Sequence, residues 1–351
     1  MSNLLSAVLG LFSEDLAIDL GTATTLVHVG ERGVVISEPS VVSIDRATGQ
    51  PLAFGAEAQK MLGRAPSNIE VIRPLRDGVI ADFDTVELML RHFFGKAQEQ
   101  ARSTRPRVVM GIPSGVTEVE KRAVHDAALN AGAREAYLIE EPLAAAIGAG
   151  LAIYDPAGSM IVDIGGGTTE VAVIALGGVV LSRSLRVGGD EIDAQIVQYA
   201  RQTHDLYIGE RTAEATKMAV GSAAREREDL RATMRGRDLV TGLPKAVEVS
   251  IREMREAISG PVNLITEAVK LSLEETPPEL LSDIMEQGIV LAGGGALLRG
   301  MDRRLAVDTD ITVHVAEDPI RCVVRGAAVC LEHMDAYRPL FTSESAPRLR
   351  L

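Results

Sequence analysis

The chain has 351 residues, of which 46% are hydrophobic and 24% charged, and this composition is that of an ordinary globular protein. Its length predicts two domains, each large enough to bury its own core. The formal net charge of −13 argues against nucleic acid as a partner, because such binding rests on neutralisation of phosphates by Lys and Arg. The cysteines Cys322 and Cys330 are too few for a disulfide framework or a cysteine-based zinc site, so we expect reduced thiols in a cytosolic protein.

The N-terminus is apolar and carries no basic residue. Its apolar side chains have roughly helical spacing, but it lacks the positive n-region and cleavage site of a secretory signal. No run in the sequence reaches the roughly 20 apolar residues that span a bilayer. Two interpretations stay open: an amphipathic helix lying in a membrane interface, or a terminus that is loosely ordered or packs on a neighbouring subunit. The residues concerned are Leu4, Leu5, Val8, Leu9, Leu11 and Phe12.

One pattern occurs twice. Residues 17–29 (AIDLGTATTLVHV) and residues 161–173 (IVDIGGGTTEVAV) each contain an apolar run, an aspartate, a glycine turn with hydroxyls and a second apolar run. The pattern predicts a β-hairpin whose turn can place backbone N–H groups against phosphate. Asp19 and Asp163 end the first strands, where a carboxylate can hold a hydrated Mg²⁺. One Asp-x-Gly alone favours a plain turn, whereas two copies followed by Thr-Thr favour two turns that grip one nucleoside triphosphate from both sides.

Strands and helices alternate between the two hairpins. A capping box at Thr117 and Glu120 predicts the start of a helix that runs to about residue 130. Pro142 suits the first turn of another helix, which follows directly on a short strand. The expected strands or extended stretches are 33–45, 52–55, 68–84, 107–112 and 136–139, and the expected helices are 56–64, 83–100, 117–130 and 142–150.

The second half restarts the pattern. A charged, aromatic-poor region over 209–256 contains the phrase RGRDLVTGLPK, to which we assign no element. Elsewhere we expect helices over 190–203, 253–274, 295–305 and 319–334, and strands over 288–292 and 311–316. Strands alternating with helices make the fold α/β. Matching hairpins at the start of each half predict two related halves with a cleft between them.

Glycine-rich turns are the candidate nucleotide-binding segments. A side chain in such a turn would block close approach of the backbone to phosphate, and the turn often needs a positive φ. A third glycine run lies between an expected strand and an expected helix, where close contact with the adenosine or α-phosphate is expected, although such runs are common plain turns. The candidates are Gly21, Thr22, Ala23 and Thr24; Gly165, Gly166, Gly167 and Thr168; and Gly293, Gly294, Gly295 and Ala296.

Glu141 is the candidate that orients the attacking water, with help from Thr168. It directly precedes a helix, whose dipole favours the ionised carboxylate, and phosphoryl transfer depends mainly on placement and charge neutralisation. Without the flanking motifs, Glu141 would be read as an acid that merely starts a helix. Glu214 and Lys217 share a helix face; they either line an adenosine pocket or form a solvated ion pair.

The order of the motifs DLGTATT, IEEPLAAAIGAG, VDIGGGTTEVAV and LAGGGALL resembles that of the actin, sugar-kinase and heat-shock-chaperone ATPase superfamily. More narrowly, GRAPSNIEVIRPLRDGVIADFD and PPELLSDI-x5-VLAGGGALLRG resemble the MreB family of bacterial actin homologues, and the likeness covers roughly residues 12–335. The resemblance implies an actin-like ATPase fold with two related, ribonuclease H-like domains and a nucleotide cleft between them. Domain I would hold 1–150 and about 320–340, with a small subdomain at 33–75. Domain II would hold 151–319, with a small subdomain at 185–250, before a loosely ordered tail at 341–351.

The resemblance also implies a site that binds ATP and Mg²⁺. Thr22, Ala23 and Thr24 would bind phosphate on one hairpin, and Gly166, Gly167 and Thr168 on the other. The metal would lie between Asp19 and Asp163, largely through water, and Glu141 would be the hydrolytic residue. The nucleoside contacts would come from Glu214, Ala215, Thr216 and Lys217, and from Gly293, Gly294, Gly295 and Ala296.

Members of this family form antiparallel double filaments on the inner face of the cytoplasmic membrane. The resemblance therefore implies self-association, membrane proteins of the wall-elongation machinery as partners, and slow ATP hydrolysis that times filament turnover. It also implies that the filaments guide cell-wall synthesis and help to set a rod shape. The same superfamily contains chaperone-type ATPases, sugar kinases and plasmid-partitioning actins, which are the alternatives.

The sequence departs from the family pattern at several places. Thr24 replaces an Asn in the first turn, where its hydroxyl can still bond phosphate, and Thr216–Ala219 replaces an Ile-Lys-His-Glu run. The loop before the strand at 107–112 is usually apolar and membrane-touching, but here residues 101–105 are basic. We therefore expect membrane contact to combine the apolar N-terminus with Arg102 and Arg105, each charge contributing about 1 kcal/mol near anionic lipid.

Overall fold

The structure is a computed structural model that describes residues 15–98, 105–227 and 229–342. The chain divides into two compact units, Met1–Ile153 with Arg321–Leu351 and Tyr154–Ile320. Within the described ranges, no helix is both long and apolar enough to cross a membrane. Several predicted features lie outside the described residues: the tail from 343 and the membrane candidates Leu4, Leu5, Val8, Leu9, Phe12 and Arg102.

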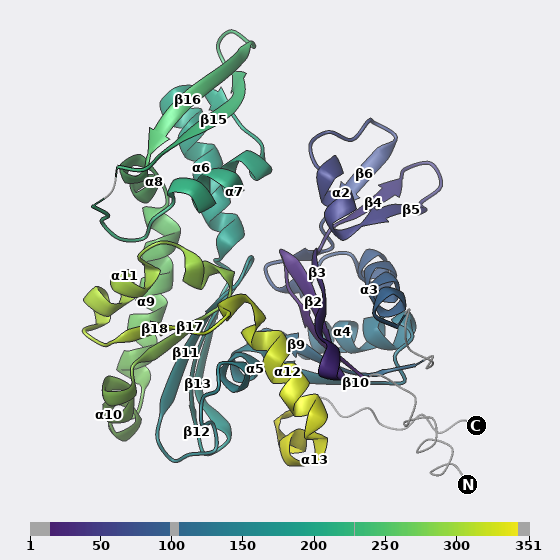
Figure 1. Cartoon of the computed structure of the whole chain (residues 1–351), viewed down its shortest axis with the longest axis vertical. Coiled ribbons are helices and arrows are strands. Elements are labelled where there is room, and N and C mark those ends of the chain that lie inside the picture. The colour runs from purple at the N-terminus through teal and green to yellow at the C-terminus, as the bar shows by residue number, and fades with distance from the viewer. Residues whose placement is uncertain (1–14, 99–104, 228, 343–351) are drawn as a thin grey trace. The chain divides into compact units, whose positions relative to one another are not determined.

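The first unit is built on a mixed sheet with the strand order β10-β9-β1-β2-β3 (Figure 1). β1 pairs antiparallel with β2, which confirms the first predicted hairpin, and parallel with β9. β1 reads as a nearly continuous apolar run because both of its faces are covered. The strands are β1 Leu16–Leu20, β2 Thr24–Val29, β3 Gly33–Pro39, β9 Arg107–Ile112 and β10 Glu135–Glu140.

Helices α3 (Phe83–Gln98) and α4 (Glu118–Ala131) pack together in the first unit. The predicted capping box of α4 is confirmed, because Glu120 N donates to Thr117 Oγ1 at 3.3 Å and Thr117 N donates to the Glu120 carboxylate at 2.7 Å. The apolar face of α3 is buried in the core, and it consists of Val86, Met89, Leu90, Phe93 and Phe94.

Helices α5 (Glu141–Gly148) and α12 (Cys322–Glu332) make the closest helix contact of this unit. A Cβ atom on Gly148 would lie 1.8 Å from the carbonyl oxygen of Cys322, and one on Gly326 would lie 1.8 Å from that of Ala144. The backbones therefore touch, which explains the run of small residues in both helices. This contact brings a segment from near the end of the chain onto the helix that starts with Glu141.

A smaller layer extends from the first sheet. It contains a sheet with the order β5-β4-β6, the helix α2 and the short hairpin β7-β8. Residues 33–45, predicted as one strand, are divided between β3 and β4 of two different sheets. The bounds are β4 Val42–Asp45, β5 Pro51–Phe54, α2 Gly55–Met61, β6 Ile69–Ile72, β7 Leu75–Arg76 and β8 Val79–Ile80; α13 (Met334–Tyr337) follows α12.

The second unit repeats the design with a sheet of order β13-β12-β11-β17-β18. β11 pairs antiparallel with β12 and parallel with β17, so the second predicted hairpin is also confirmed. Its core holds Val162, Ile164 and Val171 of the hairpin together with the buried faces of the surrounding helices. The strands are β11 Ser159–Ile164, β12 Thr169–Ala175, β13 Gly178–Leu185, β17 Ile289–Ala292 and β18 Val313–Val315.

The described residues of the region over 209–256 form regular structure in this unit. They include α7, nearly all of α8 and a long hairpin, β15-β16, whose first strand also pairs with the short strand β14. The elements of this region are α7 Glu210–Val220, β15 Arg231–Asp238, β16 Pro244–Ser250 and α8 Ile251–Ala257, and they follow α6 Gly189–His204 and β14 Leu206–Tyr207.

Some predicted helix boundaries were wrong. The helix expected over 253–274 is divided at Ile258 into α8 and α9 (Ser259–Glu275), and α10 (Pro278–Gln287) follows. The helix expected over 295–305 is a 3-10 turn, Gly294–Leu297, followed by α11 (Met301–Thr309), because Gly300 takes a left-handed conformation with φ +68° between them. The segment Pro319–Arg321 is likewise a 3-10 turn before α12.

Candidate nucleotide-binding site

The first glycine turn joins β1 to β2 and is held from two neighbouring segments. Thr22 Oγ1 accepts a hydrogen bond from Gly78 N in the β7-β8 turn at 3.0 Å. Ser40 Oγ donates to the carbonyl oxygen of Gly21 at 2.6 Å, and Ser40 N donates to that of Ala23 at 3.0 Å. A Cβ on Gly21 would lie 2.6 Å from Thr24 O, so the tight turn requires glycine. Ser40 was not predicted from the sequence. The available indication was a serine directly after the expected strand, and the structure shows that this serine is buried.

Asp19 and Glu141 lie at the same edge of the first sheet. The parallel pairing of Ile18 with Met110 places Asp19 at the carboxyl end of β1 beside the end of β9. A Cβ on Gly111 would lie 3.2 Å from Glu141 Cγ, so Glu141 stands close to the same strand end. Burial raises the pKa of Asp19 to about 7. The carboxyl ends of parallel strands are where α/β sheets bind ligands.

The second glycine turn joins β11 to β12 and is fixed by the start of α6. Gly189 N donates to the carbonyl oxygen of Gly165 at 3.0 Å, and Asp190 N donates to that of Gly166 at 2.8 Å. A Cβ on Gly188 would lie 2.7 Å from both carbonyl oxygens, so no other residue fits there. These contacts orient the peptide planes of the turn. Thr168 is buried at its end.

The third glycine run packs directly on the second turn. β17 lies beside β11, and Gly293 follows it with φ +78°. A Cβ on Gly293 would lie 2.4 Å from Asp163 Oδ1 and 2.3 Å from Ile164 O, and a Cβ on Gly295 would lie 2.2 Å from Ile164 Cγ2. The run therefore lies against the carboxylate that ends β11. Gly293 and Gly295 are therefore required by close packing inside the second unit.

The side chain of Lys217, on α7, extends to the start of α6 beside the second glycine turn. Its ammonium lies 2.8 Å from Asp193 Oδ2 on α6 and 3.1 Å from the carbonyl oxygen of Gly189. Among the described residues, no ion pair joins Lys217 to Glu214, so the solvated pair considered from sequence is not formed. Burial raises the pKa of Asp193 to about 6, although Lys217 acts in the opposite direction. Sequence reasoning missed Asp193, because its contact with Lys217 connects two different helices.

The predicted residues therefore form one group in each unit. The first unit holds Asp19, Glu141 and the turn 21–24, and the second holds Asp163, the turn 165–168, the α7 face with Lys217 and the run 293–296. In the described part of the chain, no group of at least three His, Cys, Asp or Glu side chains is arranged to hold a metal. Of the predicted membrane residues, Arg105 is described, and its side chain is exposed.

Known structures with the same architecture define the class of the protein. MreB5 of Spiroplasma citri bound to ADP superposes with a TM-score of 0.88 at 37% identity, covering 93% of this chain and 98% of that one. A MamK double helical filament superposes with a TM-score of 0.74 at 26% identity, covering 91% and 99%. The fold is thus the actin-like ATPase fold predicted from the sequence.

Curated relatives narrow the class to a family. The cell shape-determining protein MreB of Escherichia coli K12 is 52% identical over 342 residues, which are 95% of this chain and 98% of the relative. The cell shape-determining protein Mbl of Bacillus subtilis 168 is 46% identical over 325 residues, 93% and 98% of the two chains. The family model described as MreB/Mbl protein matches residues 13–339, and the chain belongs to this family.

Proposed function

We propose that this chain is a cytoskeletal ATPase that polymerises into membrane-associated filaments and helps to set a rod cell shape by guiding cell-wall synthesis. The observation that carries the proposal is the pair of matching glycine turns. A Cβ has no room at Gly21 in the first turn, nor at Gly188 and Gly293, which pack against the second. Support comes from relatives named as cell shape-determining proteins and from a structural neighbour solved as a filament.

The ligand in this proposal is ATP. Backbone N–H groups of Gly21, Thr22, Ala23 and Thr24 and of Gly166, Gly167 and Thr168 bind the phosphates, because nests of amides suit anions. Gly165 closes the second turn, since its N–H donates to Thr168 O at 2.8 Å. The nucleoside contacts the two remaining segments, Glu214–Lys217 and Gly293–Ala296. The neighbouring MreB5 structures contain ADP and AMPPNP, which supports a nucleotide here.

Asp19 and Asp163 hold Mg²⁺, largely through water. Both carboxylates end the first strand of a hairpin at its glycine turn, and carboxylate and water oxygens are the ligands that Mg²⁺ prefers. When bound, the cation neutralises charge on the phosphates. The side chain of Asp163 is kept in place by Gly293, which packs on it.

Glu141 orients the water that attacks the terminal phosphate. It is the first residue of α5, where the positive end of the helix dipole favours the ionised carboxylate. Its carboxylate accepts a hydrogen bond from the water, and Thr168 holds the same water from the other turn. Catalysis of this kind rests on placement, and we expect slow turnover that times disassembly.

The filaments lie at the inner face of the cytoplasmic membrane. The apolar N-terminal residues insert into the interface, and Arg102 and Arg105 meet anionic lipid. Partners are further copies of the chain, in antiparallel pairs, and membrane proteins of the wall-elongation machinery. Nucleic acid is not among them.

Sedimentation of the purified full chain tests the proposal. With ATP and Mg²⁺, we expect protein above a critical concentration to pellet and electron microscopy to resolve double filaments. ADP should raise the critical concentration. A chain that stays in the supernatant under all nucleotide conditions, while remaining folded by circular dichroism, would contradict polymerisation.

A further inference from the structure

Two segments of the second unit are proposed above to bind the nucleoside, and they are far apart in the sequence. Residues 214–217 belong to α7, whereas residues 293–296 follow β17 and enter the 3-10 turn before α11. Each is directly followed by a short connecting stretch, residues 218–224 after the first and residues 297–300 after the second. A nucleoside between two segments fits only one spacing of them, so contacts that join the two connecting stretches set its affinity.

Arg299 joins the two connecting stretches through its side chain. Its Nη1 group donates to the carbonyl oxygen of Ala219 at 2.8 Å and to that of Met218 at 3.1 Å. Both carbonyls lie in the last turn of α7, where backbone oxygens have no partner within the helix. A guanidinium at this place also stabilises the negative end of the helix dipole. Arg299 therefore caps the helix that carries Lys217, although it belongs to a different part of the chain.

The backbone of Arg299 makes a second link to the same stretch. Ala223 N donates to the carbonyl oxygen of Arg299 at 2.8 Å, and Ser222 pairs with Arg299 in an isolated parallel bridge. Ser222 and Ala223 are both buried, so this bridge lies inside the unit. The backbone link fixes the position of Arg299, and its side chain then determines where the end of α7 lies.

A short ordered path connects Arg299 to the third glycine run. Leu298 N donates to the carbonyl oxygen of Gly295 at 3.0 Å, which closes the 3-10 turn directly before Arg299. On the other side of Arg299, a Cβ on Gly300 would lie 2.7 Å from Ala224 Cβ, so the two connecting stretches touch there. Movement of the end of α7 away from Arg299 would therefore change the distance between α7 and the glycine run.

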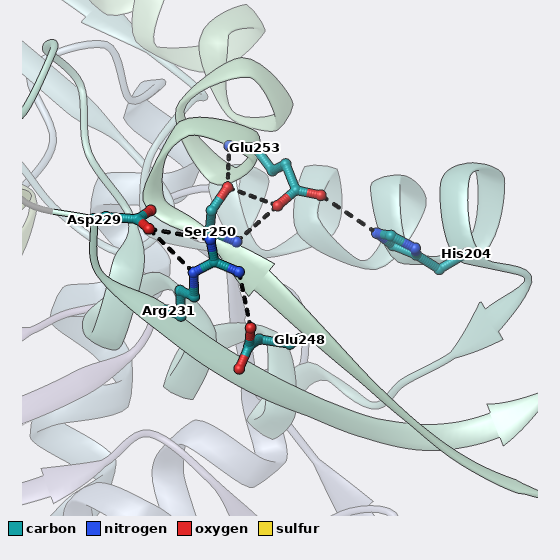
Figure 2. A network of polar contacts seen from close by, with 6 residues as sticks. All are labelled: His204, Asp229, Arg231, Glu248, Ser250 and Glu253. Carbon is teal, nitrogen blue, oxygen red and sulfur yellow. Dashed lines mark hydrogen bonds and ion pairs between the residues drawn. The ribbon is translucent and has the colours of Figure 1, made fainter.

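A separate polar network holds the hairpin that follows. Figure 2 shows Arg231 between Asp229 and Glu248, at 3.1 Å and 2.9 Å, which ties the start of β15 to β16. Ser250 Oγ donates to Glu253 at 2.6 Å in the capping box that starts α8. None of these residues belongs to the two connecting stretches. Arg231 is thus an arginine of the same unit that also has two partners, and it provides a matched control for Arg299.

The second unit should stay folded without the Arg299 side chain. Arg299 is exposed, and most changes of exposed side chains alter stability little. Arg303 on α11 pairs with Glu226, which joins α11 to the chain after α7 a second time. Val220 at the end of α7 and Leu305 of α11 are both buried in the core. Loss of the Arg299 side chain should therefore loosen the end of α7 without unfolding the unit.

We propose that Arg299 is a positioning residue for the nucleoside. It ties the C-terminal end of α7 to the chain that leaves the third glycine run, and so holds the two nucleoside-binding segments at one spacing. The inference rests on the proposed nucleotide site and names a residue that sets the affinity of this site for the base and sugar. Arg299 acts through α7 rather than by touching the ligand. The two phosphate-binding turns are held by contacts that do not include Arg299.

Binding of ADP and of inorganic pyrophosphate to the full chain tests this role. Both ligands carry two phosphates, but only ADP has a nucleoside. With Mg²⁺ present, Arg299→Ala should raise the Kd of ADP about tenfold, the change expected when charge-assisted hydrogen bonds are lost. The Kd of pyrophosphate, measured by displacement of a fluorescent ADP, should stay within about twofold of that of the natural chain. The control Arg231→Ala should bind both ligands as the natural chain does.

Two further readouts separate positioning from general damage. Arg299→Lys keeps a hydrogen-bond donor at the end of α7, so it should bind ADP about threefold or more tightly than Arg299→Ala. The fluorescent analogue etheno-ADP reports the surroundings of the base. At saturation, acrylamide should quench its fluorescence more strongly in Arg299→Ala than in the natural chain, because the base is held less closely.

The outcomes distinguish two failures. If Arg299→Ala binds ADP like the natural chain, or weakens ADP and pyrophosphate equally, the positioning inference is wrong while the nucleotide site stands. Equal ADP affinities of Arg299→Lys and Arg299→Ala would also contradict it. If the natural chain binds neither ligand, the proposed nucleotide site and this inference both fall.

Discussion

The ammonium of Lys217 lies 2.8 Å from the carboxylate of Asp193, and this ion pair joins α7 to α6 beside the second glycine turn. Asp193 is almost fully buried, and its second oxygen, Oδ1, has no hydrogen-bond partner among the described residues. Burial of a charged carboxylate costs free energy when only one of its two oxygens accepts a hydrogen bond. The pair therefore makes stability depend on pH.

Burial raises the pKa of Asp193 from 3.8 to about 6. A carboxyl group with a higher pKa in the folded chain binds its proton more tightly when folded, so its stabilising contribution is present at low pH and is lost as the pH rises through 6. The wild-type free energy of unfolding should lose about 3 kcal/mol from this group between about pH 3.5 and pH 6.5. Urea unfolding of Asp193→Asn should lack this component. The exposed change Asp335→Asn should retain it, and equal pH profiles for all three chains would contradict the assignment.

Glu141→Gln should bind ATP with unchanged affinity and hydrolyse it about 10²- to 10⁴-fold more slowly, because the neutral amide is a weaker hydrogen-bond acceptor for the attacking water than the ionised carboxylate. Phosphate release in single-turnover assays measures the rate, and fluorescence of a labelled nucleotide measures affinity. Glu135→Gln, at the start of the same β10 strand, is the control and should hydrolyse normally. Normal turnover by Glu141→Gln would remove this residue from the reaction.

Gly293→Ala should lower the free energy of unfolding by more than 2 kcal/mol, a large effect for one methyl group. The new Cβ would meet Ile164 O at 2.3 Å and Asp163 Oδ1 at 2.4 Å, and the positive φ adds strain. Because Asp163 is displaced, Mg²⁺-dependent nucleotide binding should weaken as well. At Gly294 a Cβ would meet no other described atom within 4 Å, so Gly294→Ala should change stability little. Equal stability of the two variants would contradict the packing argument.

Removal of residues 1–11 should reduce flotation of the chain with vesicles that contain anionic lipid, because the apolar N-terminal side chains are lost. Replacement of Arg102 and Arg105 by Ser should have a smaller effect that disappears at high salt, where charges are screened. Flotation at low and at high salt separates the two contributions. Undiminished flotation of the truncated chain would show that the N-terminus is not the anchor.

Local patterns predicted much of this fold. Both hairpins follow from an apolar run, an aspartate and a glycine turn, and the capping box at Thr117 predicted the start of α4. The helix break before α11 could have been predicted from Gly300, which takes a left-handed conformation there, whereas the extended backbone of Leu298 has no comparable signal in the sequence. The spacing of the apolar residues over 295–305 stays helical when a single glycine interrupts the helix, so the spacing alone did not predict the break.

Contacts between distant elements could not be predicted in this way. The Lys217–Asp193 pair and the Ser40–Gly21 hydrogen bond depend on how helices and strands pack, and no spacing along the chain encodes them. The RGRDLVTGLPK phrase was left without an element because its charges hide the alternation of a hairpin. The exposure of the apolar side chains in its turn is a property of the folded chain and could not be predicted from the sequence.

A cryo-electron microscopy structure of filaments assembled with Mg²⁺ and AMPPNP would test the proposal that the two glycine turns bind one triphosphate. We expect the backbone amides of Gly21–Thr24 and of Gly166–Thr168 to contact the phosphates of the same nucleotide, with Mg²⁺ between Asp19 and Asp163. A nucleotide that touches only one of these turns, or that binds elsewhere on the chain, would contradict the account.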